Sequence, residues 1–324
     1  MKVPHLNSGN TFGVGIVRDN GEILANTRSI YTPEKGGIVP REAVAHHSEK
    51  AKEIVEKSLQ EAKLKLADID LISFAAGPGL LPCLRIGAVI ARTLALRLDK
   101  PIMAVNHMIG HVEIGKLTAG CKDAVVLYVS GGNSLVLTFT GGRYREFGST
   151  QDIAIGNALD MFAREAGLKH PGGPKIEQLA KKGSWISLPY VVKGCDLSFS
   201  GIVTDAIKKL KTEKLEDICF SLQETCFSML TEVVERAVAH TDKEEVLLTG
   251  GVAANKRLQE MLSIMCKERG AKFHVVPAEY SGDNGAMIAW TGLLAYKSGQ
   301  RQKIEDTEIN RFWRTDQVDV TWLK

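Results

Sequence analysis

The chain has 324 residues, which is enough for two domains or for two lobes around a cleft. With 44% hydrophobic and 24% charged residues it has an ordinary globular composition, and its net charge of +3 permits nucleic-acid binding without demanding it. The first residues lack the apolar segment of a secretory signal, and the longest apolar runs are only as long as a strand. We therefore expect a cytoplasmic protein with reduced cysteines, and the absence of a C-x-x-C pair disfavours a zinc knuckle.

In the first half of the chain, strand patterns are followed by alternating helices and strands. Residues 11–17 alternate as a strand, and Asn20 and Gly21 mark a hairpin turn into a second strand at 22–30. Pro40 suits the first turn of a helix that continues to about residue 62. The pattern then predicts a buried strand at 69–76, a turn at 77–79, a helix at 84–98 and a short strand at 102–105.

The second half repeats this order. It opens with strands at 124–130, 135–139 and 144–148, followed by helices at 158–166, 175–182 and 221–240, a strand at 245–249, a helix at 254–268, a strand at 272–276 and a helix at 284–296. The sequence therefore predicts an α/β protein of two related lobes, each a mixed sheet flanked by helices. Glycine-rich turns at strand ends would line a cleft between such lobes.

Two histidines, His107 and His111, lie four residues apart in a segment expected to be helical. This spacing places two imidazoles on one helix face, where they can hold one metal ion. A metalloprotease would need H-E-x-x-H, with a glutamate as general base, but Met108 occupies that place. The spacing alone leaves open a histidine pair that binds no metal.

Two glycine-rich turns each follow a hydrophobic strand. In the first, Ser130, Gly131 and Gly132 allow the backbone to approach an anion. In the second, Gly250 and the residues up to Asn255 lead from a strand into a helix, and the N-terminus of that helix also favours an anion. Either turn could instead be a plain connection, and Asn255 could bind a base or sugar or face solvent.

Three carboxylates and one charged stretch have two interpretations each. Asp160 and Glu177 could accept hydrogen bonds from ribose hydroxyls or lie on helix surfaces. Asp283 could be a metal ligand or the N-cap of the helix that follows it. Residues 205–217 could be the solvated face of a helix or a basic patch for RNA.

Ten ordered blocks, spread over nearly the whole chain from residue 11, resemble one family. The blocks are GGIVPREAVAHH, GPGLLPCLR, AVNHMIGHVEIGKL, LYVSGGN, DIAIGNALDMFAREAG, HPGGPKIEQLA, LPYVVKGCDLSFSG, SLQETCFSML, TGGVAANKRL and GDNGAMIAW. They look like the threonylcarbamoyltransferases that modify tRNA, called TsaD in bacteria and known as the catalytic subunit of the KEOPS complex in archaea and eukaryotes. The style of the blocks is archaeal or eukaryotic.

The resemblance implies the two-lobed, duplicated fold of actin-like ATPases (the ASKHA fold). The expected N-terminal lobe is 1–118 plus 290–324 and the C-terminal lobe is 119–289, with nucleotide and metal in the cleft between them. The implied reaction transfers the threonylcarbamoyl group from threonylcarbamoyl-AMP to the exocyclic amine of the adenosine 3′ of the anticodon in ANN-decoding tRNAs, releasing AMP. The implied partners are tRNA and the KEOPS subunits, including a small protein kinase and a small dimerising subunit.

The resemblance also implies a role for individual residues. The metal ligands would be His107, His111, Tyr128 and Asp283, a set that favours iron over zinc. The adenine nucleotide would contact Tyr128, Val129, Ser130, Gly131, Gly132, Asp160, Gly173, Glu177 and Asn255. The metal would act as a Lewis acid, and the adenylate is already a good leaving group, so no protein nucleophile is required. His46 and His47 are the candidates for a general base.

The chain departs from the family pattern in three places. Residues 5–10 lack the acid of the family's first turn, and Pro4 is expected to interrupt the first strand. Ser134 and Leu135 stand where Thr-Gln is usual. Ser149 stands where a glutamate is usual, and catalysis would be weakened if that carboxylate is functional.

Three other functions compete with the transferase. A kinase or ATPase of the same fold would use magnesium, which prefers oxygen ligands and would not call for imidazoles. A metalloprotease is opposed by the missing glutamate. The altered N-terminus makes a catalytically impaired or structural KEOPS subunit that binds nucleotide the third alternative.

Overall fold

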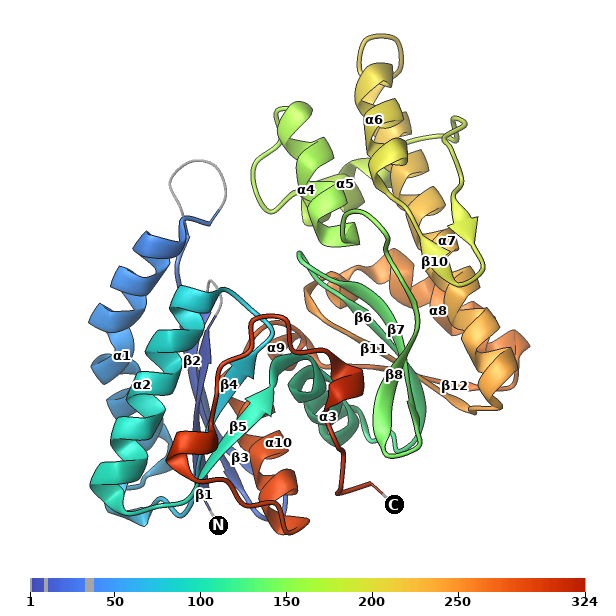
Figure 1. Ribbon diagram of the computed structural model, residues 1–324. Coiled ribbons are helices and arrows are strands. Elements are labelled where there is room, and N and C mark those ends of the chain that lie inside the picture. The colour runs from blue at the N-terminus through green and yellow to red at the C-terminus, as the bar shows by residue number, and fades with distance from the viewer. Residues whose placement is uncertain (1, 9–10, 33–37, 324) are drawn as a thin grey trace. The chain divides into compact units, whose positions relative to one another are not determined.

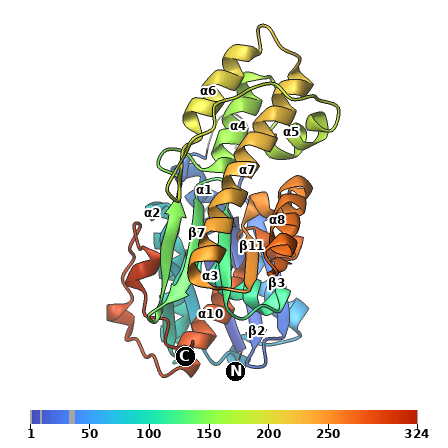
Figure 2. The same ribbon diagram turned by 90° about the vertical axis from the view of Figure 1, so that its right-hand side faces the viewer.

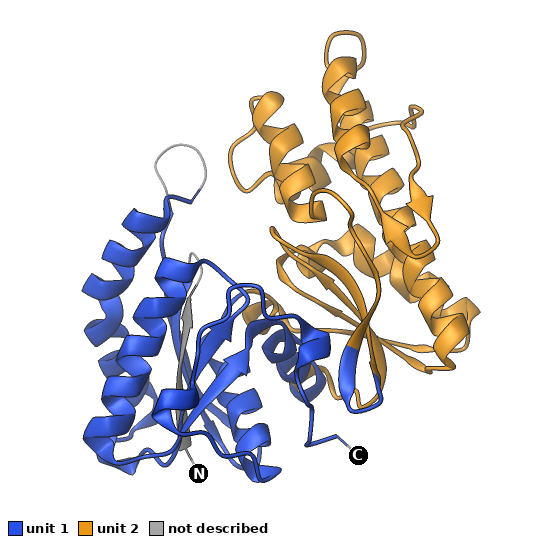
Figure 3. Ribbon diagram, viewed as in Figure 1, with its two compact units in different colours: residues 1–117, 140–144, 283–324 blue, residues 118–139, 145–282 orange. Residues whose placement is uncertain are grey.

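The computed structural model describes the backbone of residues 2–8 and all atoms of residues 11–32 and 38–323. By its internal contacts the chain forms two compact units (Figure 3). Unit 1 comprises Met1–Leu117, Thr140–Tyr144 and Asp283–Lys324, and unit 2 comprises Thr118–Phe139 and Arg145–Gly282. The chain therefore enters unit 2 twice: it returns briefly to unit 1 through residues 140–144 after the first entry, and returns finally at Asp283.

Unit 1 is built on a five-stranded mixed sheet of order β3-β2-β1-β4-β5. Its strands are β1 (Lys2–Ser8), β2 (Thr11–Arg18), β3 (Ile23–Ile30), β4 (Ile72–Gly77) and β5 (Ile102–Asn106). The first three strands are antiparallel neighbours, whereas β4 is parallel to both β1 and β5. The expected hairpin between the second and third strands is thus present.

The expectation that Pro4 interrupts the first strand was wrong. β1 continues through Pro4, which pairs with Ile16 of β2. The parallel pairing with β4 begins only after it, with His5 opposite Ser73. The missing N–H of proline therefore falls outside the described ladder between β1 and β4, which is where a strand tolerates proline. Residues 9 and 10 of the unusual first turn lie outside the described residues.

Helices cover both faces of this sheet, and the alternation of β2 shows why (Figure 1). Val14 and Ile16 point toward α1 (Pro40–Ala62), which lies beside α2 (Leu81–Leu98). Gly13 and Gly15 point the other way, toward the start of α10 (Gly285–Lys297). Because successive strand residues face opposite sides, the large residues build one core layer and the glycines admit a helix backbone on the other.

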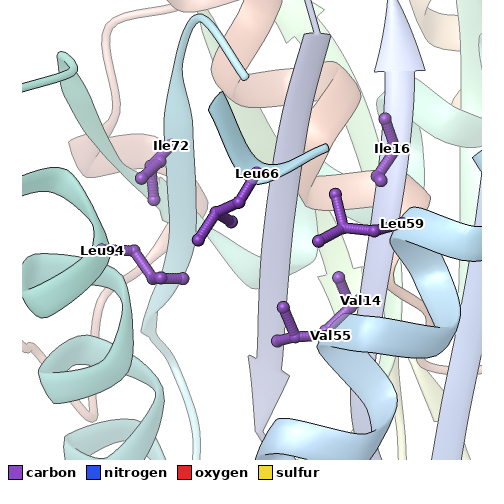
Figure 4. Close-up of a pocket in the computed structure, with 7 residues that line it drawn as sticks. All are labelled: Val14, Ile16, Val55, Leu59, Leu66, Ile72 and Leu94. Carbon is purple, nitrogen blue, oxygen red and sulfur yellow. The ribbon is translucent and has the colours of Figure 1, made fainter. Parts of the chain in front are cut away.

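The layer between the sheet and the α1–α2 pair contains a cavity of about 10 Å³. Its lining is entirely apolar and consists of Val14, Ile16, Val55, Leu59, Leu66, Ile72 and Leu94 (Figure 4). A buried water needs polar partners, which this cavity does not offer. It is therefore a packing gap in the core and not a ligand site.

Unit 2 repeats the sheet of unit 1. Its five strands have the order β12-β11-β6-β7-β8, with β6 in the place of β1 and β11 in the place of β4. The strands are β6 (Ala124–Val129), β7 (Ser134–Thr140), β8 (Arg143–Ser149), β11 (Glu245–Thr249) and β12 (Lys272–Val275). β6 pairs antiparallel with β7 and parallel with β11, as β1 does with β2 and β4. The predicted internal repeat is thus present in the sheet topology.

The helices of unit 2 are more numerous than the sequence pattern predicted (Figure 2). They are α4 (Ile155–Glu165), α5 (Gly172–Ala180), α6 (Ser200–Lys209), α7 (Leu215–Thr241), α8 (Lys256–Glu268) and α9 (Ala278–Ser281), with a small hairpin of β9 (Val192–Lys193) and β10 (Asp196–Leu197). The charged stretch 205–217 is not one solvated helix face, because α6 ends and α7 begins within it. Among the described residues, the helices include none that is both long and apolar enough to cross a membrane.

Replacement of Gly15 by alanine tests the close contact between β2 and α10. A Cβ atom at Gly15 would lie 2.2 Å from the backbone nitrogen of Ala286, and neither backbone can move aside cheaply. We expect Gly15→Ala to lower the free energy of unfolding by roughly 1–3 kcal/mol, measured by urea denaturation.

Gly201→Ala in α6 is the matched control, because a Cβ there meets open space. It should leave stability unchanged or raise it by up to about 1 kcal/mol, since alanine favours helix. Equal effects of the two substitutions would contradict the packing described here.

Candidate metal centre and nucleotide-binding turns

The two histidines of the H-x-x-x-H pair lie on α3 (His107–Ala119), which begins directly after β5. Asn106 caps this helix, because its Oδ1 accepts hydrogen bonds from the backbone N–H groups of Met108 and Ile109 at 3.0 and 3.2 Å. The rings of His107 and His111 are neighbours, with centroids 4.9 Å apart. The predicted placement of both imidazoles on one helix face is confirmed.

Asp283 is held at the start of α10, but it is not the cap of that helix. Asn284 is the N-cap, because its Oδ1 accepts a hydrogen bond from the backbone of Met287 at 3.0 Å. Asn26 of β3 accepts hydrogen bonds from the next two backbone N–H groups, of Gly285 and Ala286, at 3.1 and 3.2 Å. The alternative that Asp283 caps the helix was therefore wrong, and its carboxylate remains available for other contacts.

The three side chains converge on one point within unit 1. One oxygen of Asp283, Oδ1, lies 3.3 Å from Nε2 of His107 and 3.2 Å from Nε2 of His111. Within the described part of the chain, these residues form the one group of three potential metal ligands, and their ligand atoms all lie within 4.8 Å of one another.

The donor spacing fits a metal ion. Two atoms that bind one ion at about 2.1 Å and at the tetrahedral angle lie roughly 3.4 Å apart, close to the distances between Asp283 and the two imidazoles. Two imidazoles with one carboxylate are ligands that suit iron or zinc. The residues present therefore make a possible metal site.

The environment sets the protonation states that such a site needs. Burial lowers the pKa of His111, and this outweighs the hydrogen bond to Asp283. Burial alone would raise the pKa of Asp283, but the charge of His107 and the hydrogen bonds of both imidazoles hold that pKa well below its usual range. His111 is thus held as a neutral imidazole and Asp283 as a carboxylate, the forms that bind metal ions.

Three other residues of the predicted site belong to other elements. Tyr128 belongs to unit 2, where it is buried near the end of β6, so its membership in the metal set stays a prediction. His46 and His47 lie on α1, where Nε2 of His46 is 3.0 Å from the hydroxyl of Ser29. Their role as a general base also stays a prediction.

The glycine-rich turns of unit 2 follow neighbouring parallel strands, so they lie at the same edge of the sheet. Gly250 has φ +97°, and a Cβ atom there would lie 2.3 Å from the carbonyl oxygen of Val129. Gly156, at the start of α4, donates its N–H to the carbonyl of Ser130 at 3.2 Å, and a Cβ atom there would lie 2.6 Å from that oxygen. Two glycines therefore let a second turn and a helix N-terminus contact the first turn directly.

Gly131 and Gly132 differ from these packed glycines. Both are exposed, and a Cβ atom at either position would meet no other group. The turn that contains them is closed by hydrogen bonds between Ser130 and Asn133 at 2.8 and 3.1 Å. Their backbone is thus held in place from one side and open on the other, which is what close approach of a phosphate requires.

The expected adenosine-binding side chains tie three helices together. Asp160 of α4 accepts a hydrogen bond from the first backbone N–H of α5 at 2.7 Å, next to Gly173. Glu177 of α5 accepts one from the first backbone N–H of α8 at 2.8 Å. Asn255 caps α8 with its oxygen and donates its amide to Gln223 at 3.1 Å. Asn255 is buried, so the alternative that it faces solvent was wrong.

Two of the departures from the family pattern have structural roles. The hydroxyl of Ser134 accepts a hydrogen bond from the backbone of Ile155 at 2.8 Å, so it helps to hold the start of α4. Ser149 is buried, and its backbone donates to Asp196 at 3.2 Å. Asn26 and Gly156 also support the site, but no spacing in the sequence distinguishes them from an ordinary strand asparagine and helix glycine.

Comparison with known proteins identifies the family. The TsaD family model, described as tRNA N6-adenosine threonylcarbamoyltransferase, matches residues 22–290. A tRNA N6-adenosine threonylcarbamoyltransferase from Thermococcus sibiricus is 57% identical over 318 residues, which cover 97% of this chain and 98% of that protein. The chain belongs to the TsaD family. The TsaD relatives also include a protein from Thermococcus kodakarensis, 56% identical over 97% of both chains.

Some TsaD relatives are longer. A probable bifunctional tRNA threonylcarbamoyladenosine biosynthesis protein from Methanothermobacter thermautotrophicus is 56% identical over 314 residues. The match covers 96% of this chain but only 59% of that protein. The chain thus spans about three fifths of the length of that relative.

Solved structures confirm the expected actin-like ATPase fold for this TsaD family member. HypF from T. kodakarensis has a TM-score of 0.64 at 16% identity, with 94% of this chain and 49% of that chain covered. The activator of 2-hydroxyisocaproyl-CoA dehydratase from Clostridium difficile, solved with bound ADPNP, has a TM-score of 0.54 at 13% identity. That match covers 94% of this chain and all of the activator. At such identities the likeness concerns the fold alone.

Replacement of Asn255 tests whether this residue contributes to the stability of unit 2. Asn255→Ala should lower the free energy of unfolding by about 1–2 kcal/mol, because the cap of α8 and the buried bond to Gln223 are both lost. Asn255→Asp should retain most of the cap and cost less. Urea denaturation measures both, and an alanine variant as stable as the wild type would contradict the described role.

Proposed function

We propose that the chain transfers the threonylcarbamoyl group from threonylcarbamoyl-AMP to the exocyclic amine of the adenosine 3′ of the anticodon in ANN-decoding tRNAs, releasing AMP. The observation that carries this proposal is the convergence of His107, His111 and Asp283 in a member of the TsaD family. The TsaD relatives from Thermococcus are tRNA N6-adenosine threonylcarbamoyltransferases by name, which supports tRNA adenosine as the acceptor. We place this reaction in the cytoplasm, where tRNA decodes.

The metal set would consist of His107, His111 and Asp283, completed by Tyr128. Phenolate, imidazole and carboxylate ligands together favour iron, with zinc as the next choice. Magnesium is disfavoured because it prefers oxygen ligands, and this argues against a kinase-type reaction. A bound ion would act as a Lewis acid toward the threonylcarbamoyl group.

The adenylate would bind to unit 2. The open backbone from Val129 to Gly132 suits the phosphate, with the N-terminus of α4 beside it. Glu177 uses one carboxylate oxygen toward Lys256, and the other would accept a ribose hydroxyl. Asp160, Gly173 and Asn255 would shape the adenosine site by holding the starts of α5 and α8.

The chain's own residues would bind and orient the reactants, because AMP is a good leaving group and no acyl-enzyme is needed. The cysteines agree with this proposal. Five of the six are buried, and burial raises the pKa of Cys219 to about 12 and that of Cys266 to about 11, so neither is a thiolate near neutral pH. His46 and His47 remain the candidates for the base that accepts the amine proton.

Partner proteins would supply part of the tRNA affinity. A net charge of +3 is small for a protein that binds tRNA alone, because phosphate contacts dominate such binding. We propose that the chain acts with the KEOPS subunits, namely a small protein kinase and a small dimerising subunit.

A single-turnover assay tests the reaction. Threonylcarbamoyl-AMP and an unmodified ANN-decoding tRNA are mixed with the chain, with and without the KEOPS partners, and modified adenosine is measured. Wild type should form product, and His107→Ala should lose at least about a hundredfold in rate, because one metal ligand is gone. Product from His107→Ala at the wild-type rate would contradict the metal-dependent reaction.

Gly131→Val tests the nucleotide turn separately from folding. A side chain there meets open space within the chain, so the free energy of unfolding should change by less than about 0.5 kcal/mol. The same side chain would occupy the space that a phosphate approaches, so AMP affinity should fall at least about tenfold. Calorimetric titration with AMP measures this, and Gly201→Val is the exposed control. Unchanged AMP affinity would place the phosphate elsewhere.

A further inference from the structure

Glu113 and Lys116 of α3 form a buried polar cluster with Tyr144 of β8, on the side of the helix that faces away from His107. The hydroxyl of Tyr144 donates to Oε1 of Glu113 at 2.7 Å, and Nζ of Lys116 lies 3.3 Å from the same hydroxyl. Lys116 and Glu113 also form an ion pair at 3.9 Å. The side chains of Glu113 and Tyr144 are only 3% and 1% exposed. Their polar atoms therefore need hydrogen-bond partners within the protein. We call these three residues the α3 triad.

The two α3 residues of the triad lie on a different face of the helix from the two histidines. At 3.6 residues per turn, Glu113 and Lys116 are turned roughly 180–240° around the helix axis from His107. From that side of the helix, the triad can influence the imidazoles by setting how α3 is rotated and how far it lies along its axis.

Other contacts of α3 are distributed along the helix. Asn106 caps the first turn through two hydrogen bonds to the backbone. Gly110 packs against α10, where a Cβ atom would lie 2.8 Å from the side chain of Ile288. These two contacts hold the first half of the helix. In the second half, a Cβ atom at Gly21 would lie 2.8 Å from the side chain of Leu117, and the carbonyl of Ala119 lies 3.1 Å from Nδ1 of His274. The triad adds a buried group of polar side chains to these contacts.

The partner residue of the triad is itself firmly held. Tyr144 belongs to residues 140–144, the tip of the β7–β8 hairpin that groups with unit 1 (Figure 3). Next to it, Arg143 binds Asp319 at 2.9 and 2.6 Å and the carbonyl of Asp316 at 3.1 Å. The backbone of Val320 donates to the carbonyl of Gly142 at 2.8 Å. The hairpin tip is therefore hydrogen-bonded to the C-terminal segment on one side and to α3 on the other.

We infer that Glu113, Tyr144 and Lys116 are positioning residues: the α3 triad fixes the rotation of α3 and thereby holds the imidazoles of His107 and His111 at the right distance from Asp283 for a metal ion. The inference rests on the proposed metal site. Oδ1 of Asp283 lies 3.3 and 3.2 Å from Nε2 of His107 and His111. Because one ion can bridge these atoms only at about such distances, a small rotation of the helix would separate them too far. The anchored hairpin tip opposes that rotation.

The test measures Co²⁺ binding by the full chain, with affinity from chelator competition and ligand geometry from the visible absorption of the bound ion. Tyr144→Phe keeps the ring and removes the hydroxyl, and we expect a loss of affinity of about tenfold with an altered spectrum, as for outer-shell partners of metal ligands. Glu113→Gln keeps an acceptor for that hydroxyl and should lose only about threefold. Tyr190→Phe is the matched control, because it removes a tyrosine hydroxyl that bonds Glu232 in unit 2, and it should bind as wild type does.

The outcomes separate this inference from the proposed function. A folded Tyr144→Phe with wild-type affinity and spectrum overturns it. If Tyr144→Phe does not fold, Glu113→Gln decides, with unchanged binding as the contrary result. If wild type binds no Co²⁺, the assigned metal ligands fail. Amide hydrogen exchange of residues 107–117 then decides: faster exchange in Tyr144→Phe than in Tyr190→Phe supports the positioning role, and equal exchange overturns it.

Discussion

The backbone contact between β2 and the first turn of α10 is the constraint on which the candidate metal centre depends. A Cβ atom on Gly285 would lie 2.0 Å from the nitrogen of Gly15, so the two segments meet with no side chain between them. Asn26 adds two hydrogen bonds to the same helix start. Asp283 directly precedes Asn284, the N-cap of this helix. Its position is therefore set by backbone packing and not by a flexible side-chain contact, and α3 need only bring its two imidazoles to it.

Unit 2 also contains close backbone contacts at glycines, but they hold a different feature in place. Its sheet has the strand order of unit 1, and glycines again allow backbones to meet, here where Gly156 and Gly250 contact the turn after β6. In unit 1 the close packing fixes a carboxylate. In unit 2 it fixes a turn whose outer side, at Gly131 and Gly132, is left open. The two copies of the duplicated sheet thus support different features, namely a carboxylate beside two imidazoles in unit 1 and an open glycine turn in unit 2.

Much of this could be predicted from the sequence, because it depends on local pattern. The His107–His111 spacing, the glycine turns and the internal repeat all follow from periodicity and from the needs of turns. The sequence pattern was wrong at Pro4, which lies within β1 and pairs with Ile16. It left two alternatives open that the structure decides, since Asn284 rather than Asp283 caps α10 and Asn255 is buried as the cap of α8. Nothing local predicted that Tyr144 would meet Glu113, because the two come from different elements.

The most direct test of the central claim is X-ray absorption spectroscopy of the purified chain loaded with iron or zinc. The account predicts one ion per chain, nitrogen and oxygen ligands at about 2.0–2.2 Å, and the scattering pattern of two imidazoles. His111→Ala should remove one imidazole from that pattern. An ion bound through sulfur, an ion with no imidazole, or a chain that holds no ion would contradict the account.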